Sequence, residues 1–187
     1  MPTSAEVGAV FGAAFADDPV WHWMCGPTKA RAVTAALTRF GHERHAAEFD
    51  LVDGAAAWWH APGEWKLGIA ETLLLVPRVL PLVGPRALRL LRMSALVESQ
   101  HPDDGSAYLG WLGASVQGQG RGAAAIAPGL RRCDENGWAA YLETSNPRNH
   151  AFYQRHGFVL GEPLKVLPGC PPLWPMRRDP IRSHASG

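Results

Sequence analysis

The chain has 187 residues, of which 47% are hydrophobic and 19% are charged, and its formal net charge at pH 7 is +1. This length and composition exclude a disordered chain and predict a single domain, residues 1–187, around one substantial core. The near-zero charge excludes an extended basic surface, so we expect neither nucleic acid nor a membrane as a partner. The most apolar stretch, residues 73–91, holds three arginines and three prolines, which excludes a membrane span.

Cysteine and histidine usage indicate the compartment and the cofactor class. The three cysteines have neither CxxC nor metal-ligand spacing, and the N-terminus has no secretory signal pattern. We therefore expect reduced thiols and a cytoplasmic location. The segment "HERH" at 42–45 lacks one residue of the zinc motif HExxH, so no metal site is expected. The excess of arginine over lysine, with abundant alanine and glycine, is typical of a GC-rich bacterial genome.

The N-terminal half is predicted to form two helices and then a hairpin. Thr3 and Glu6 form a capping-box pattern, Thr28 is a candidate cap for the second helix, and Asp53-Gly54 is a strong two-residue turn signal. The predicted elements are a helix up to residue 16, a loop over 17–28, a helix to about residue 45, and strands at 48–52 and 55–60.

The C-terminal half is predicted to alternate strands and helices. Pro77, Pro81 and Pro85 are expected to break the helical pattern, and Asn146 with Pro147 is a helix-start signal. The predicted elements are two helical pieces within 64–99, a strand at 107–114, a helix to about 136, a strand at 138–145, a short helix at 147–156, and strands within 158–167 and 170–178. This order predicts an α+β or α/β fold with a mixed sheet.

A glycine-rich turn after the strand at 107–114 is the first chemical signal. Gly118, Gly120 and Gly122 allow several backbone N–H groups to approach one anion, and the following helix N-terminus adds positive potential. The turn lacks the Lys-Ser/Thr ending of a Walker A loop and the GxGxxG spacing of a dinucleotide site. By itself the pattern is equally consistent with a tight strand-to-helix turn.

A second segment indicates which ligand the glycine-rich turn binds. The turn is similar to the Gln/Arg-x-x-Gly-x-Gly/Ala pyrophosphate loop of the GCN5-related N-acetyltransferase (GNAT) superfamily. "YLETSNPRNHAFYQRHGF" at 141–158 resembles the second acetyl-CoA segment of that superfamily, at the expected separation of one helix and one strand. "AAFADDP", "DGAAAWWHAPGE" and Pro128-Gly129 further resemble puromycin N-acetyltransferase-like bacterial small-molecule acetyltransferases.

The resemblance implies an α+β GNAT fold with helices on both faces of a mixed sheet, splayed between its two central strands, and acetyl-CoA as co-substrate. A strand usually precedes the first helix in this superfamily, so we expect that strand to be missing or the chain to be truncated. The loop fits two registers, Gln117-x-x-Gly120-x-Gly122 and Gln119-x-x-Gly122-x-Ala124. The residues implied in acetyl-CoA binding are Leu112, Gly113, Ala114, Gln117, Gly118, Gln119, Gly120, Arg121, Gly122, Asn149 and Phe152.

The resemblance also implies catalytic roles. Tyr153 occupies the position of the superfamily's tyrosine general acid, which protonates the departing thiolate; the alternative is a packed helix tyrosine. Glu143 is a candidate base, or else a structural acceptor for a buried hydroxyl or arginine. Strand alternation sets it on the face opposite Leu142 and Thr144. Backbone N–H groups near residues 112–114 are expected to stabilise the oxyanion.

Four tryptophans are candidates for the acceptor site. Trp21 and Trp23, and Trp58 and Trp59, lie in segments that wall the acceptor site in this superfamily, and aromatic walls suit a ring-bearing amine. The alternative is that these side chains are core. Asp17 and Asp18 either attract a cationic amine or end the first helix.

The sequence thus predicts an acetyl-CoA-dependent N-acetyltransferase that acts on a primary amine of a small, aromatic, antibiotic-like molecule such as an aminonucleoside. Two alternatives stay open: a peptide or protein N-acetyltransferase, and a non-catalytic acyl-CoA-binding module. The oligomeric state, monomer or homodimer, is left open.

Overall fold

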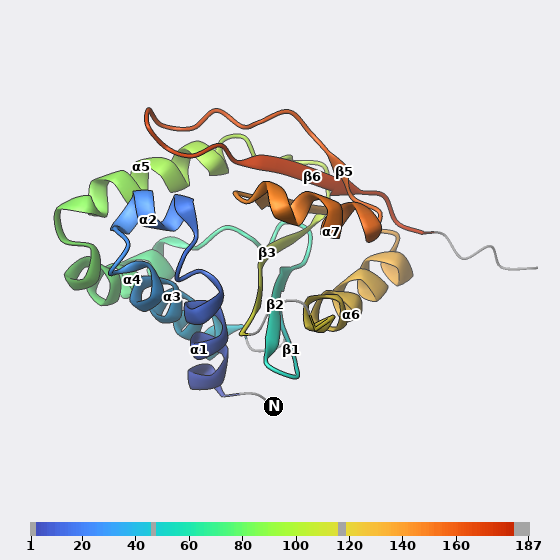
Figure 1. The fold of residues 1–187 in the computed structure, drawn as a ribbon, viewed down its shortest axis with the longest axis horizontal. Coiled ribbons are helices and arrows are strands. Elements are labelled where there is room, and N and C mark those ends of the chain that lie inside the picture. Colours follow the sequence, from blue (N-terminus) through green and yellow to red (C-terminus); the bar gives the residue numbers. More distant parts are fainter. Residues whose placement is uncertain (1–2, 46–47, 116–118, 182–187) are drawn as a thin grey trace, which may run out of the picture.

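The computed structural model describes residues 3–45, 48–115 and 119–181, and their elements form one mixed sheet with helices on both faces (Figure 1). The elements are α1 Ser4–Ala14, α2 Pro19–Cys25, α3 Ala30–Arg44, β1 Phe49–Val52, β2 Ala55–His60, α4 Ile69–Val83, the 3-10 turn η2 Gly84–Arg86, α5 Ala87–Glu98, β3 Ala107–Ala114, α6 Arg121–Asn136, β4 Ala140–Thr144, the 3-10 turn η3 Pro147–Asn149, α7 His150–Arg155, β5 Val159–Leu160 and β6 Trp174–Arg178.

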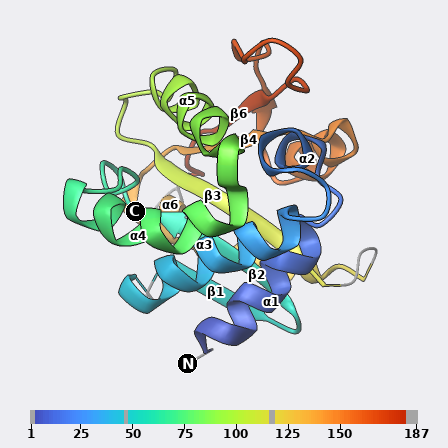
Figure 2. The ribbon, with the colours of Figure 1, turned by 90° about the vertical axis from the view of Figure 1, so that its left-hand side faces the viewer.

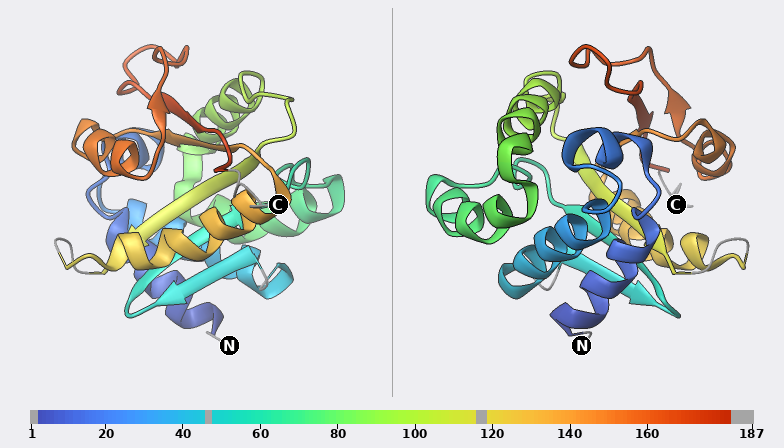
Figure 3. Two further views of the ribbon diagram at one scale, coloured as in Figure 1. Left: turned by 90° about the vertical axis from the view of Figure 1, so that its right-hand side faces the viewer. Right: turned by 60° about the vertical axis from the view of Figure 1, so that its left-hand side comes forward.

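The sheet has six strands in the order β1-β2-β3-β4-β6-β5, and this confirms the predicted mixed α+β class. Only β3 and β4 pair in parallel, while the other neighbours are antiparallel. Helix α6 crosses one face of the sheet (Figure 3), and α1 to α5 gather on the opposite side (Figure 2). The sheet therefore separates a face covered by α6 and α7 from a face covered by the N-terminal helices.

A β-bulge decides which β3 side chains face which layer. Trp58 pairs with Trp111 and Trp59 pairs with Leu109, so Gly110 is the extra residue. Before the bulge Leu109 joins the core under α6, and after it Leu112 packs there, while Trp111 packs on the α1 side. The bulge thus turns both Tyr108 and Trp111 toward the face of the N-terminal helices.

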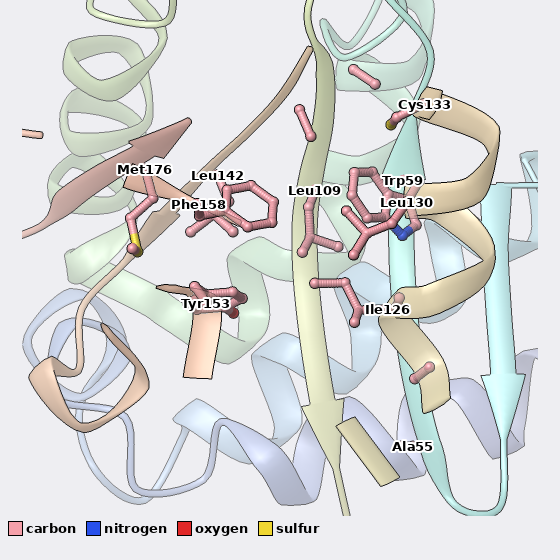
Figure 4. Packing of buried hydrophobic residues seen from close by; sticks show 14 residues of the cluster. Ala55, Trp59, Leu109, Ile126, Leu130, Cys133, Leu142, Tyr153, Phe158 and Met176 are labelled. Carbon is pink, nitrogen blue, oxygen red and sulfur yellow. The ribbon is translucent and has the colours of Figure 1, made fainter. Parts of the chain in front are cut away.

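Trp58 and Trp59 of β2 pack on opposite faces of the sheet, and each lies against a glycine of a helix. A Cβ on Gly129 of α6 would lie 2.0 Å from Trp59 Nε1, and one on Gly41 of α3 would lie 2.3 Å from Trp58 Cη2. Trp59 belongs to the main core, seen in Figure 4 beside Ile126 and Leu130, and Trp58 packs with Phe49 on the other face. These glycines let both layers sit close to the sheet.

Several local predictions are confirmed. The Thr3–Glu6 capping box starts α1, and the hairpin turns at Asp53 and Gly54, whose φ angles are 45° and 75°. Asn146 caps the turn that leads into α7 by accepting from the Arg148 N–H.

The segment 17–28 is not a loop, and this prediction is wrong. Pro19–Cys25 form helix α2, because the Asp18 carboxylate accepts from the N–H groups of Val20 and Trp21, both at 2.9 Å. Pro19 stands at the first helical position, where its missing N–H costs nothing. Thr28 does not cap the next helix either, since α3 has Lys29 at its N-cap.

Pro77 and Pro81 do not break the helical segment, although we expected them to. Both lie inside α4, and the helix gives way only at the turn that contains Pro85. The two prolines are exposed, so carbonyls left without an N–H partner can be solvated. Val79 and Val83 on the opposite side are buried and hold the helix in place.

Candidate active site

The two central strands diverge soon after they start. β3 and β4 pair only at Ala107 with Ala140 and at Tyr108 with Tyr141. Beyond these two pairs the strands run apart, which is the predicted splay. The edge of β3 that faces β4 therefore carries no ladder over residues 109–114, and the backbone near Leu112, Gly113 and Ala114 lies along this opening.

The glycine turn leads from the splay into α6. Gly120 has φ 71° and is the N-cap of α6, and a Cβ built there would meet no atom of the described residues within 4 Å. The first turn of a helix directs N–H groups outward without intrahelical acceptors, so this end of α6 suits an anion. Gly122 stands next to α7, since its Cβ would lie 3.5 Å from the Phe152 ring. Gln117 and Gly118 lie outside the described residues.

The remaining cofactor candidates border the same region. Gln119 is exposed, and Arg121 reaches back toward the hairpin, where its Nη1 would lie 3.4 Å from a Cβ on Gly54. Asn149 is exposed at the N-cap of α7 and makes no capping hydrogen bond, so the structure gives its side chain no helix-capping role.

Tyr153 is a core residue with a buried phenol. It packs with Leu142, Phe158 and Met176 on the β4 side of β3, as Figure 4 shows, and only 7% of its surface is exposed. Burial raises the pKa of the Tyr153 hydroxyl well above its ordinary value, so the group stays protonated. The raised pKa keeps the proton on the phenol but also makes the phenol a weaker acid.

Glu143 points to the face opposite Leu142 and Thr144, as strand alternation predicts. Its Oε2 accepts a hydrogen bond of 2.8 Å from the Tyr108 hydroxyl, and its Oε1 is buried without a hydrogen-bond partner among the described residues. Burial raises the pKa of the Glu143 carboxyl to about 7, against the lowering effects of the Tyr108 hydroxyl and the nearby Tyr141 hydroxyl. A carboxyl with this pKa can accept a proton near neutral pH.

A large cleft opens where Glu143 points. Its volume is about 630 Å³, and β3, β4, α2, α4 and α5 contribute its walls. Figure 2 looks onto the helices that border it. Aromatic side chains from four separate segments line it near Glu143: Trp21, Trp65, His101, Tyr108 and Trp111.

The four predicted acceptor tryptophans separate into two groups. Trp21 lines the cleft and its ring centroid lies 5.1 Å from that of Trp111. Trp23 is not among the cleft residues and packs instead under the Arg89 guanidinium, 4.8 Å from its ring centroid. Trp58 and Trp59 are only 9% and 4% exposed, lie in the two cores and are not among the cleft residues, which favours the alternative that they are core.

Asp18, for which the sequence left open a role in attracting a cationic amine or in ending the first helix, borders the cleft. Asp18 caps α2 with one carboxylate oxygen, accepts from the Ser145 hydroxyl with the other, and borders the cleft together with Ser145. Its role is therefore neither to end α1 nor to stand free in solvent. Tyr108, Trp111 and Trp65 were missed because their contact with Glu143 or the cleft depends on the bulge and on chain packing. For Asp18, the Asp-Pro pair at 18–19 is a helix-start signal that could have revealed its capping role.

The described residues hold neither a metal-ligand cluster nor a membrane-spanning helix. Over residues 3–45, 48–115 and 119–181, no group of three His, Cys, Asp or Glu side chains is placed to hold a metal ion. Within the same part of the chain, no helix is both long and apolar enough to cross a bilayer.

Comparison with known proteins supports one class. No family model matches the chain. An uncharacterised N-acetyltransferase of Schizosaccharomyces pombe is 27% identical over 164 residues, covering 78% of this chain. The match spans 66% of that yeast protein, slightly less than two thirds of its length.

Solved structures show the same fold. A histone acetyltransferase HPA2-related acetyltransferase from Corynebacterium glutamicum superposes with a TM-score of 0.68 at 24% identity, covering 97% of this chain and 93% of that one. An agmatine N-acetyltransferase superposes with a TM-score of 0.58 at 13% identity, covering 94% of each chain. The chain therefore has the fold of these acetyltransferases, which is the fold that the resemblance to the GCN5-related N-acetyltransferases implies.

Proposed function

We propose that the protein is an acetyl-CoA-dependent N-acetyltransferase that acts on the primary amine of a small molecule. The observation that carries this proposal is the splay of β3 from β4, which opens between the N-terminus of α6 on one side and Glu143 with its cleft on the other. A thioester that enters the splay from the α6 side would meet an amine that enters from the cleft.

The acetyl-CoA site would use the residues along the splay. The open cradle at Gly120 and the first N–H groups of α6 would hold the pyrophosphate, with Arg121 nearby. The uncommitted amide of Asn149 would bind the pantetheine arm, and Phe152 would border it. When bound, the co-substrate supplies the activated acetyl group.

Glu143 and Tyr153 would divide the proton transfers. With a pKa of about 7, Glu143 would take a proton from the attacking amine, directly or through water. Tyr153 would give a proton to the departing thiolate, whose ordinary pKa is ~8.5. Backbone N–H groups on the unpaired edge of β3 near Leu112–Ala114 would stabilise the negative charge on the carbonyl oxygen.

The acceptor would be a ring-bearing amine. The cleft residues Trp21, Trp65 and Trp111 offer aromatic surfaces beside Glu143, and Asp18 adds a second carboxylate that attracts an ammonium group. This supports an arylalkylamine or an aminonucleoside of the antibiotic type, in line with the resemblance to puromycin N-acetyltransferase-like enzymes. A peptide N-terminus is the second candidate, because the cleft is large enough for a side chain and its backbone.

The proposal is tested with a panel of amines and acetyl-CoA, read out as free thiol. The panel contains an aminonucleoside, arylalkylamines, a polyamine and a short peptide with a free N-terminus. We expect thiol release above acetyl-CoA hydrolysis with at least one aromatic amine, and its loss in Glu143→Gln. Acetyl-CoA binding by calorimetry without turnover of any amine would instead favour the non-catalytic module, and absence of binding would overturn the assignment of the splay.

A further inference from the structure

The cleft has two chemically different ends. Near β4 it is bordered by the polar groups of Glu143, Asp18 and Ser145. The wall that α4 and α5 contribute is aliphatic over most of its length. Its lining there includes Leu75, Val79, Leu80, Val83, Leu90 and Leu91. The polar side chains that these two helices add are Thr72, Ser94 and Glu98.

The aliphatic wall continues to the surface. Leu80 and Leu91 both line the cleft, yet they are 48% and 55% exposed. Leu67 and Val76 also line the cleft and are 48% and 40% exposed. The interior of the cleft and its rim are therefore one continuous apolar surface. Such a surface gains stability when an apolar ligand removes it from water.

From this division, and resting on the proposed function, we propose that the ring-bearing acceptor is an amphipathic primary amine that also carries an extended apolar tail, whose contribution a simple alkylamine can probe. The amine would lie against Glu143 and Asp18, where charge is complementary. The tail would pass the aromatic cleft residues Trp21, Trp65 and Trp111. It would then run along α4 and α5 toward the rim. A small polar amine would leave the aliphatic wall in contact with water, so it would use only part of the cleft.

Chain length provides the first test. We expect kcat/KM for straight-chain primary alkylamines to rise from propylamine to octylamine, by about fourfold for each methylene that becomes fully buried. The increase should level off once the tail passes the rim at Leu80 and Leu91. A flat or falling series would overturn the proposed tail site, provided that some amine in the panel is acetylated.

Two pairs of variants localise the effect. Leu91→Gln and Leu80→Gln change residues that line the cleft; Leu88→Gln and Leu73→Gln change residues on the same helices that are 56% and 70% exposed and do not line it. We expect the ratio of kcat/KM for octylamine to that for propylamine to fall at least fivefold in the first two variants and to hold within twofold in the others. Equal ratios in all four would overturn the proposal.

A binding measurement separates this proposal from the proposed function. Calorimetric titration of the protein with octylamine needs neither acetyl-CoA nor turnover. Binding of octylamine that Leu91→Gln weakens and Leu88→Gln does not would support the tail site even if no acetyl transfer occurred. Turnover of aromatic or polar amines, with no octylamine binding, would leave the acetyltransferase proposal standing and overturn the tail site.

Discussion

Glu143 combines two environments that rarely coincide on one side chain. One carboxylate oxygen accepts from Tyr108, and the other is buried with no hydrogen-bond partner in the described chain while the side chain borders a large cleft. Desolvation penalises the charged form, and this raises the pKa of the carboxyl to about 7. The residue is therefore poised to exchange a proton in the range where amines are still partly protonated.

Glu143→Gln should remove a limb of the pH profile. In the wild type we expect kcat to rise with pH through about 7, because the base must be deprotonated to act. The Gln variant keeps a hydrogen-bond acceptor for Tyr108 but cannot titrate, so kcat should fall by about 10²-fold and lose that limb. Steady-state kinetics from pH 5.5 to 9 measure both. A variant that retains the wild-type limb would assign the titration to another group.

The same substitution should change how stability depends on pH. Between pH 4.5 and about 7 the unfolded chain has released the Glu143 proton while the folded chain still binds it. The unfolded state therefore binds fewer protons, so the wild-type free energy of unfolding falls as pH rises through this window. The total loss is on the order of 3 kcal/mol, and it should be absent in Glu143→Gln. Urea unfolding of both proteins at pH 4.5, 6 and 8 tests the difference.

Tyr153 offers a test that separates chemistry from packing. Tyr153→Phe removes one hydroxyl and keeps the ring that packs on Leu142 and Phe158. If the phenol protonates the thiolate, kcat should fall by about 10²-fold while acetyl-CoA affinity is unchanged. Near wild-type turnover, with an unchanged melting temperature, would leave Tyr153 as a core residue.

At the scale of elements, helix α6 has two ends with the same backbone requirement. Gly120 at its N-cap and Gly137 at its C-cap have φ angles of 71° and 68°, and in the part of the chain that the structure describes no atom lies within 4 Å of a Cβ built at either. Only the N-terminal end carries the positive potential and the outward N–H groups that an anion needs. The two positions are therefore a matched pair for testing phosphate binding.

Gly120→Ala should weaken acetyl-CoA binding, and Gly137→Ala should not. Both substitutions strain a left-handed residue and should destabilise the fold by similar amounts, about 1–2 kcal/mol. The Cβ on residue 120 additionally occupies the space proposed for the pyrophosphate, so we expect at least a tenfold higher Kd for that variant alone. Calorimetry measures the acetyl-CoA affinities, and thermal unfolding measures the loss of stability that both variants share. Equal affinities would move the phosphate site elsewhere.

At the scale of the whole molecule, the cleft exists only because segments distant in sequence meet. Trp21 comes from α2, Trp65 from the connection before α4, and Trp111 from β3 after the bulge. None of these segments forms a pocket alone. The acceptor preference is therefore a property of the assembled fold, and it should respond to substitutions in α2 that leave the sheet intact.

Trp21→Ala should raise KM for an aromatic amine several-fold, because one aromatic contact contributes roughly 0.5–1.5 kcal/mol beyond area burial. Trp23→Ala is the control, since this side chain lies on the same helix outside the cleft. A short aliphatic amine, which cannot stack, should be affected much less by Trp21→Ala. Equal effects of the two variants on the aromatic amine would assign Trp21 to packing.

The sequence by itself determined what depends on neighbouring residues. The Thr3–Glu6 capping box, the turn at Asp53-Gly54 and the cap at Asn146 are local hydrogen-bond or backbone patterns, and each stands where it was predicted. The buried strands around Leu109 and Leu142 were predictable from apolar runs. The alternation of β4 also set Glu143 on the correct face.

Tertiary structure decided what local pattern leaves ambiguous. Asp18-Pro19 signals a turn or a helix start equally well, and packing of α2 on the core selects the helix. The bulge at Gly110 reverses the alternation of β3, which no periodicity in "AYLGWLGA" announces. Trp58 and Trp59 became core because Gly41 and Gly129, distant in sequence, make room for them. The cleft depends on such contacts between distant segments, because a pocket is the space that packing leaves between elements. It is not a property of any single element.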